Sequence, residues 1–336
     1  MGSYDVKVTI DLTKPIGKVG FGMPLLLVEN ATAAVEYTVV SNQAEIVAAG
    51  FTAETEVYKA AQLLFMQNHS PKQIAVCAVT GTAAAAMADV ILVNKDWRHL
   101  IVINEGDEAT NYTELITAFE ALDSKLLFIG LPVDDSTSIN VTGLRRTVLF
   151  YCDPTDEYPV PVAALVGEIA GRTAGSFTYK NVVLSGIPAQ ELTDTQIDAI
   201  HKKGGMTFVA KAGDNVTSEG MVAGGEYIDV IDTEDYIVQQ LAYKTQKLLN
   251  NAAKVPYDNN GIAMLESVAV DVLQGAFNDG MIAINEDGSP AYSVTYAMNE
   301  DCNEKDRANR RYLGGSFAFT LAGAIHYAEI TGTITA

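Results

Sequence analysis

Cysteine and histidine are scarce in this chain of 336 residues, and neither type is clustered. The three cysteines lie far apart and no CxxC pair occurs, which argues against a disulfide framework and a zinc knuckle. The four histidines are scattered, without HExxH or any other spacing typical of metal ligands. These residues are Cys77, Cys152, Cys302, His69, His99, His201 and His326. The sequence therefore predicts no metal site.

Positive charge and long apolar runs are also in short supply. The chain has 22 Lys and Arg residues against 42 Asp and Glu residues, a formal net charge of −20. Such a surface repels phosphate backbones, so nucleic acid is not expected as a direct partner. No apolar run is long enough to span a bilayer, and the N-terminus lacks the pattern of a signal peptide. We expect synthesis in a cytoplasm and no membrane insertion.

Motifs for phosphate binding and nucleophilic catalysis are missing as well. The run GKVGFG over residues 17–22 has the spacing GxxGxG rather than GxGxxG, and no P-loop motif occurs. No GxSxG motif surrounds Ser185 or Ser316. The sequence therefore predicts no catalytic residue and no cofactor, and the glycine run is interpreted as a flexible hinge.

One acidic pair remains a candidate for chemistry. Asp134 and Asp135 lie in the polar loop PVDDSTS, directly after an apolar run typical of a strand. Active sites of α/β proteins collect at the carboxyl ends of the strands. The pair is therefore either part of a site or a plain solvated loop.

Apolar runs that alternate with helical patterns fill the first two thirds of the chain. Runs such as HLIVIN and KLLFIGLP between helices indicate a largely parallel sheet covered on both faces. This predicts a doubly wound α/β domain over residues 23–210, with a helix in AAAAMADVIL and a strand in NVVLSGI. After Gly213 the pattern predicts a hairpin in DNVTSEGMVAGGEYIDVID, two long helices and short strands. These form a mixed α+β C-terminal domain over residues 211–323.

Both ends of the chain show the alternation of a half-buried strand. The apolar positions are Val6, Val8, Ile10 and Leu12 at one end, and Ala328, Ile330 and Ile334 at the other. Either these strands pair within their own domain, or residues 1–22 and 324–336 are extended arms that add strands to a neighbour's sheet.

A basic cluster stands out in this acidic chain. Lys305, Arg307, Arg310 and Arg311 fall within eight residues, in a segment compatible with a helix. The cluster is either a solvated helix face or a docking strip for an acidic protein partner, whose register it would set by charge complementarity.

Several segments taken together resemble the contractile tail sheath family of phages and phage-derived injection machines. Their order and spacing cover most of the chain, although each is a loose pattern. The segments are SNQAEIVAAGFTAETEVYKAAQLLFMQ, PVAALVGEIAGRTAGSFTYKNVVLSGI, EDYIVQQLAYKTQKLL, KVPYDNNGIAMLESVAVDVLQ and DRANRRYLGGSFAFTLAGAIHYAEITGTI.

The resemblance implies a subunit that stacks as hexameric rings around a tail tube, with baseplate and tail terminator proteins as further partners. It implies that the C-terminal domain lies against the tube and that both arms exchange strands with neighbouring subunits. The implied arm residues are Val6, Val8, Ile10, Ile325, Tyr327, Ile330 and Ile334. Hinges are expected at Gly17, Gly20, Gly22 and Gly323, and tube contacts at Lys305, Arg307, Arg310 and Arg311.

The leading hypothesis is a structural, non-enzymatic protein: a sheath subunit that polymerises helically in a virion tail or phage-like particle and contracts to drive the tube through an envelope. Contraction requires that rigid domains can pack in two ways and that the extended packing is metastable. Flexible tethers then keep the subunits joined, in a helical assembly that does not close on itself. Two alternatives stay open. One is an enzyme or small-molecule binding module on the doubly wound sheet, with Asp134 and Asp135 near its site. The other is a different self-assembling component, such as a tube or baseplate protein.

Overall fold

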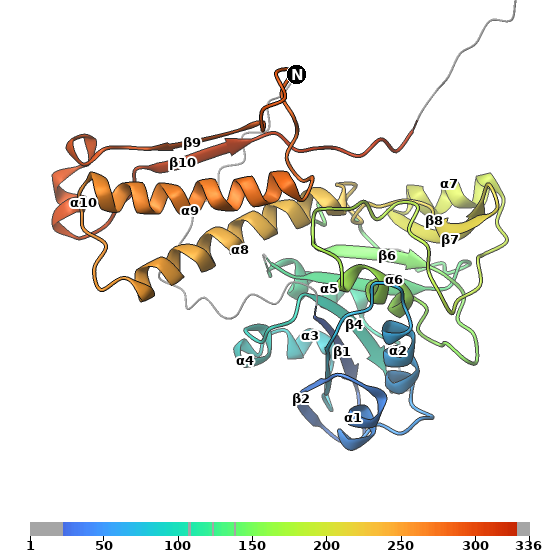
Figure 1. The fold of residues 1–336 in the computed structure, drawn as a ribbon. Coiled ribbons are helices and arrows are strands. Elements are labelled where there is room, and N and C mark those ends of the chain that lie inside the picture. Colours follow the sequence, from blue (N-terminus) through green and yellow to red (C-terminus); the bar gives the residue numbers. More distant parts are fainter. Residues whose placement is uncertain (1–22, 107–108, 123, 138, 328–336) are drawn as a thin grey trace, which may run out of the picture. The chain divides into compact units, whose positions relative to one another are not determined.

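The computed structural model describes residues 23–106, 109–122, 124–137 and 139–327 (Figure 1). The chain divides into two compact units, with the boundary between Tyr243 and Lys244. We call described residues 23–243 the α/β unit and described residues 244–327 the C-terminal unit. In these residues no helix is long and apolar enough to cross a membrane.

An eight-stranded sheet forms the centre of the α/β unit. Its strand order is β2-β3-β1-β4-β5-β6-β7-β8, in which the six inner strands are parallel and β2 and β8 run antiparallel at the edges. The strands are β1 (Pro24–Glu29), β2 (Val35–Val40), β3 (Ile74–Ala78), β4 (His99–Asn104), β5 (Leu126–Leu131), β6 (Thr147–Tyr151), β7 (Gly205–Lys211) and β8 (Asp214–Thr217). The predicted, largely parallel sheet is confirmed.

Both faces of this sheet are buried, which is why its inner strands are continuous apolar runs. In β1, Leu26 and Val28 belong to the core of one face, and Leu25 and Leu27 to the core of the other. Helices α1 (Gln43–Ala48), α2 (Glu56–Phe65) and α6 (Val162–Ala170) contribute to the first core, and α3 (Ala83–Ala86), α5 (Tyr112–Glu120) and α7 (Asp194–Lys202) to the second. Figure 1 shows α2 beside α6 on one side of the strands.

Local sequence decides where several of these helices begin. Thr193 and Gln196 form a reciprocal capping box at the start of α7. The side chains of Thr55 and Asn111 accept bonds from backbone N–H groups in the first turns of α2 and α5. These are the residue types that satisfy the free N–H groups of a helix start.

Three expectations for the α/β unit differ from the structure. NVVLSGI does not form a strand, because Asn181 and Gly186 have φ angles of 61° and 86° and leave only the bridge from Val183 to Val216. The alanine-rich segment splits into α3 and α4 (Val90–Val93), since the Asp89 carboxylate accepts from the Ile91 N–H and restarts the helix. The edge strand β2 was not predicted, and its alternation is interrupted by a register shift between Val35 and Thr38.

A long helix, α8 (Ile228–Asn251), crosses the boundary between the two units. Its start lies within the segment predicted as a hairpin, of which β8 and an isolated bridge between Met221 and Tyr227 are present. The α/β unit thus extends past residue 210, where the sequence pattern changes; the predicted domain limits stay predictions.

The C-terminal unit combines the end of α8 with α9 (Asn259–Asn278), β9 (Tyr292–Tyr296), a 3₁₀ turn (Asn299–Asp301), α10 (Glu304–Ala308) and β10 (Gly315–Phe319). Asp258 caps α9 by accepting from the N–H groups of Asn260 and Gly261. Gly261 is required there, because an added Cβ would lie 1.9 Å from the Pro256 carbonyl oxygen. The predicted α+β character of this region is confirmed.

Candidate assembly surfaces and a buried ion network

The C-terminal unit contains a sheet of only two strands. β9 and β10 pair antiparallel, with Val294 opposite Phe317. The side chains of Tyr292, Val294 and Tyr296 are half-buried, and Tyr292 Oη donates to Gln274 of α9 at 3.0 Å. In the described residues, no third strand joins this sheet. Two strands alone are marginally stable in water, so the free edges are suited to accept further strands.

The opposite face of this small sheet is polar or small and open. Ser293, Thr295, Ser316 and Ala318 are exposed on it. Glycine is required at position 315 by close packing and not by an unusual φ angle, because an added Cβ would lie 2.8 Å from the Tyr296 ring. A flat face of short side chains allows close approach of another chain.

Exposed large apolar side chains are concentrated in the C-terminal unit. It holds eight of the fourteen such residues, although it has less than a third of the described residues. Ile325 is 88% exposed and Tyr327 is 81% exposed, both in the segment that follows β10. The others are Leu249, Met264, Val270, Ile284, Met298 and Leu313. A high share of exposed apolar side chains is what a unit shows when another protein covers it in an assembly.

The predicted basic cluster lies on and after α10. Arg307 pairs weakly with Glu304 (4.0 Å) and donates to the carbonyl oxygen of Asn299. Lys305, Arg310 and Arg311 are exposed and make no ion pair with a described residue. The structure therefore leaves three cationic side chains available to solvent in a chain of net charge −20.

Arg310 adopts an unusual backbone conformation at the end of α10. Its φ is 57°, and the N–H groups of Arg310 and Arg311 donate to the carbonyls of Arg307 and Asp306. This is the helix ending in which glycine is the usual residue, because a Cβ is disfavoured there by roughly 1 kcal/mol. An arginine in this position is not explained by the stability of the turn.

Three tyrosines pack around this turn. Tyr312 stacks on Tyr296 at 5.8 Å between ring centroids and meets Tyr257 edge-on at 6.1 Å. Tyr312 Oη donates to the carbonyl of Ala297, and burial raises the pKa of Tyr312 to about 12. The stack ties the basic turn to the β9–β10 sheet.

Several predicted site residues lie outside the described residues: Val6, Val8, Ile10, Gly17, Gly20, Gly22, Ile330 and Ile334. Gly323 is described, and an added Cβ would meet nothing within 4 Å. Its predicted role as a hinge stays a prediction.

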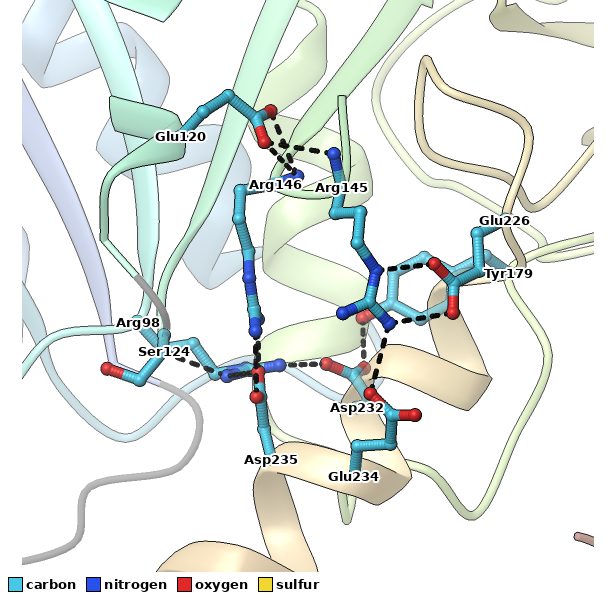
Figure 2. A network of polar contacts seen from close by, with 10 residues as sticks. All are labelled: Arg98, Glu120, Ser124, Arg145, Arg146, Tyr179, Glu226, Asp232, Glu234 and Asp235. Atoms are coloured by element: carbon cyan, nitrogen blue, oxygen red, sulfur yellow. Dashed lines mark hydrogen bonds and ion pairs between the residues drawn. The ribbon is translucent and has the colours of Figure 1, made fainter. Parts of the chain in front are cut away.

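A buried ion network in the α/β unit was missed by sequence reasoning (Figure 2). Arg98, directly before β4, contacts Asp232 and donates to Asp235 at 2.8 Å. Arg146, directly before β6, donates to Asp235 at 2.5 Å, and Tyr179 Oη donates to Asp232 at 2.6 Å. All five residues are almost fully buried. The network joins the first turns of α8 to the amino ends of two strands.

Electrostatics explain why these charges persist in the interior. Burial alone would lower the pKa of Arg98, but the charges of Asp232 and Asp235 outweigh burial and hold that pKa above its usual value. Burial, together with Asp232, raises the pKa of Tyr179 well above its usual value. The two arginines and two aspartates balance in charge, as buried ions must.

A second set of contacts surrounds the buried network. Arg145 donates to Glu226 at 2.6 and 2.8 Å and to Glu234 at 3.0 Å (Figure 2). Glu120, at the end of α5, accepts from the backbone N–H groups of Arg145 and Arg146. Two sequence features could have pointed to these contacts. One is the pair of arginines before an apolar run, and the other is the acidic start of α8. Acidic side chains there suit the positive end of the helix dipole.

The acidic pair Asp134 and Asp135 takes part in loop contacts. Asp135 Oδ1 accepts from the Thr137 N–H at 2.5 Å, and the Asp135 carbonyl accepts from Lys203 at 2.8 Å. Asp134 is exposed. A small open pocket beside this loop is lined by Tyr151, Lys202, Lys203 and loop residues, without either carboxylate.

Glu29 ends β1 at the point between β1 and β4 where the strand order reverses. The Glu29 carboxylate, 2% exposed, accepts from the Ala83 N–H at 2.7 Å and from the Thr110 hydroxyl. Ligands of open α/β sheets bind at such a point. Here the Glu29 carboxylate of the protein itself binds the first N–H group of α3.

Residues 228–334 match the family model described as the C-terminal domain of E217 tail sheath protein gp31-like proteins. This segment is therefore similar to a tail sheath C-terminal domain. The match begins at the first residue of α8 and includes the two-stranded sheet and the basic turn, and it bears out the resemblance predicted from the sequence. No curated protein sequence matches the chain.

Solved structures extend the similarity from this segment to the whole fold. A chain of the baseplate of the anti-feeding prophage has a TM-score of 0.71 and 16% identity, with 100% of this chain and 99% of that chain covered. A chain of its helical sheath in the contracted state has a TM-score of 0.71 and 15% identity, covering 99% and 98%. A chain of the PVC extracellular contractile injection system, from its sheath complex in the contracted state, has a TM-score of 0.71 and 10% identity, covering 99% and 97%. The chain therefore has the fold of contractile sheath proteins.

Proposed function

We propose that this protein is a structural subunit of a contractile tail sheath, which polymerises helically around a tail tube and shortens to drive the tube through an envelope. The observation that carries the proposal is the tail sheath C-terminal domain match over residues 228–334, joined to similarity with sheath chains along the whole length. The apolar surface concentrated in the C-terminal unit supports it, because an assembly would bury that surface.

The arms are proposed to link neighbouring copies. On this proposal, residues 1–22 and 324–336 of neighbours add strands to the free edges of the β9–β10 sheet. The high exposure of Ile325 and Tyr327 supports an arm that leaves its own unit. Val6, Val8, Ile10, Ile330 and Ile334 are the proposed apolar positions of the added strands, and Gly17, Gly20, Gly22 and Gly323 the hinges.

The basic turn is proposed to face the tube. Lys305, Arg307, Arg310 and Arg311 would meet acidic groups on the tube protein, where charge complementarity sets register more than affinity. The strained φ of Arg310 supports a role other than stability. Further proposed partners are other copies of the chain in a hexameric ring, a baseplate and a tail terminator. Synthesis is proposed to take place in the host cytoplasm.

A non-enzymatic role is part of the proposal. The Glu29 carboxylate, at the point where the strand order reverses, binds the Ala83 N–H of the protein itself, and Asp135 is engaged in its own loop. Neither feature favours the alternative of an enzyme or small-molecule binding module.

Electron microscopy of the purified protein over a series of protein and salt concentrations tests the proposal. Hollow striated tubes, formed by the protein alone or after addition of a purified tail tube, are the expected result. Dispersed particles under all of these conditions, with the tube present, would contradict it.

A further inference from the structure

A small cavity lies beside the buried ion network of the α/β unit. Its volume is about 10 Å³, and the start of β4, the end of α6 with the segment that follows it, and the first turns of α8 form its wall. A cavity of this size offers about the room that one water molecule needs. The polar residues of the wall are Arg98, His99, Arg172, Tyr179 and Asp232, of which Arg98, Tyr179 and Asp232 are drawn in Figure 2.

Two nitrogen atoms of residues in this wall have no protein partner. His99 Nδ1 and Arg172 Nε are both buried, and neither atom makes a hydrogen bond with another residue in the described part of the chain. His99 is 4% exposed. Buried polar atoms of folded proteins are nearly always hydrogen-bonded, and ordered water serves as the partner where no protein group does.

Both side chains are held in place by their other contacts. The Arg172 guanidinium contacts the buried Glu168 carboxylate and lies over the Phe177 ring, 5.1 Å from its centroid. The His99 ring meets Phe128 edge-on, with 5.6 Å between the ring centroids. These contacts prevent either side chain from turning its unpartnered nitrogen toward solvent.

The charges in and next to the cavity wall favour an uncharged ligand. The ion pairs there contain three arginines and three carboxylates, and these six residues are Arg98, Arg146, Arg172, Glu168, Asp232 and Asp235. Burial, together with the charge of Arg98, lowers the pKa of His99 well below its usual value, so its ring is neutral at neutral pH. An added anion or cation would leave a buried charge without a counterion.

We propose that this cavity binds one water molecule, which accepts a hydrogen bond from Arg172 Nε and forms a second hydrogen bond with His99 Nδ1. An arginine Nε–H can only donate, so it requires an acceptor, and water is an acceptor small enough for the site. The bound water links the end of α6 to the start of β4. This site is a property of the folded α/β unit and does not depend on assembly into a sheath.

Crystal structures of the full chain, grown in one buffer without halide and in one with bromide, test the site. The expected result is a peak of electron density within about 3.2 Å of both nitrogens, without an anomalous bromide signal. A bromide peak at this position would identify an anion site and overturn the proposal. A cavity without density, or a direct bond between Arg172 and His99, would overturn it as well.

Magnetic relaxation dispersion of oxygen-17 water counts the long-lived internal water molecules in solution. His99→Phe should contain one fewer than the native chain, because the larger apolar ring fills the cavity and removes a bonding partner. His69→Phe is the matched control, since His69 binds Glu168 but does not line the cavity, and it should leave the count unchanged. An unchanged count in folded His99→Phe would overturn the proposal. If this variant fails to fold, the crystal structures of the native chain still decide.

Discussion

The α/β unit and the C-terminal unit differ in how much of their apolar and charged surface is buried. The α/β unit buries both faces of its sheet and encloses a network in which two arginines pair with two aspartates. The C-terminal unit has a small core around Ala269, Leu273 and Ala276, a sheet of two strands and a large share of the exposed apolar surface. One unit is complete by itself, whereas the other has the features of a structure that is completed by neighbours.

The contrast predicts that the α/β unit determines the stability of the folded chain and that the C-terminal unit determines its association with other copies. Changes in the buried network should affect folding of the α/β unit, and changes in the C-terminal unit should affect association with little effect on folding. The predictions below are arranged by the size of the expected effect.

Deletion of residues 324–336 should abolish polymerisation while the thermal unfolding of the α/β unit stays unchanged. The deleted segment includes Ile325 and Tyr327, whose side chains are exposed and contribute little to the folded monomer. Electron microscopy and calorimetry of the same preparation measure the two effects. Tubes formed by the truncated chain would show that this segment is not an arm.

Asp232→Asn should lower the free energy of unfolding of the α/β unit by about 3–5 kcal/mol, because Arg98 would keep a buried charge without its full partner. Asp271→Asn is the control in the C-terminal unit, where the pair with Lys244 is exposed and its loss should cost about 0–1 kcal/mol. Denaturant titration measures both. Equal losses in the two variants would remove the distinction between the units.

Lys125→Met should stabilise the α/β unit by roughly 1–3 kcal/mol at pH 6. Lys125 is 7% exposed, and its ammonium donates to the Trp97 carbonyl at 2.5 Å and lies 3.8 Å from the centroid of the Trp97 ring. Burial lowers the pKa of Lys125 to about 7. Because the unfolded chain binds this proton up to about pH 10.5, stability of the native protein should rise with pH between 7 and 10.5.

The variant should show a flatter dependence in the same range, measured by denaturant titration at several pH values. Lys202→Met, at an exposed lysine, is the matched control and should change stability by less than about 0.5 kcal/mol at every pH. An identical pH dependence in the protein and in Lys125→Met would contradict the assignment.

Arg310→Gly should stabilise the C-terminal unit slightly, by roughly 0.5–1 kcal/mol, because glycine favours the φ of 57°. It should weaken binding to a tail tube through loss of the charge. Arg310→Ala keeps the strained φ and loses the same charge, so it should weaken binding without the gain in stability. Cosedimentation with tubes and calorimetry separate the two effects; unchanged binding in both variants would exclude Arg310 from the contact.

Sequence patterns predicted the fold well where a single physical requirement acts along a continuous stretch. The apolar runs of β4 and β5 are buried on both faces, and the capping residues of α7 lie next to the helix that they start. Prediction failed where distant residues decide the outcome. NVVLSGI has the composition of a strand, yet it lies beside β8 for a single bridge. No pattern along the chain predicts that two of the four acidic residues near the start of α8 bind Arg98 and Arg146.

The sequence by itself determined the alternation of strands and helices, the absence of common catalytic motifs, the excess of acidic residues and the resemblance to sheath proteins. These features depend on composition and on neighbours along the chain. Only the tertiary structure decided that the Glu29 carboxylate binds the Ala83 N–H, that two arginines before different strands share Asp235, and that the fully buried positions of α8 end at Leu241. Each of these depends on residues far apart in sequence, whose meeting is set by the packing of the whole sheet and its helices.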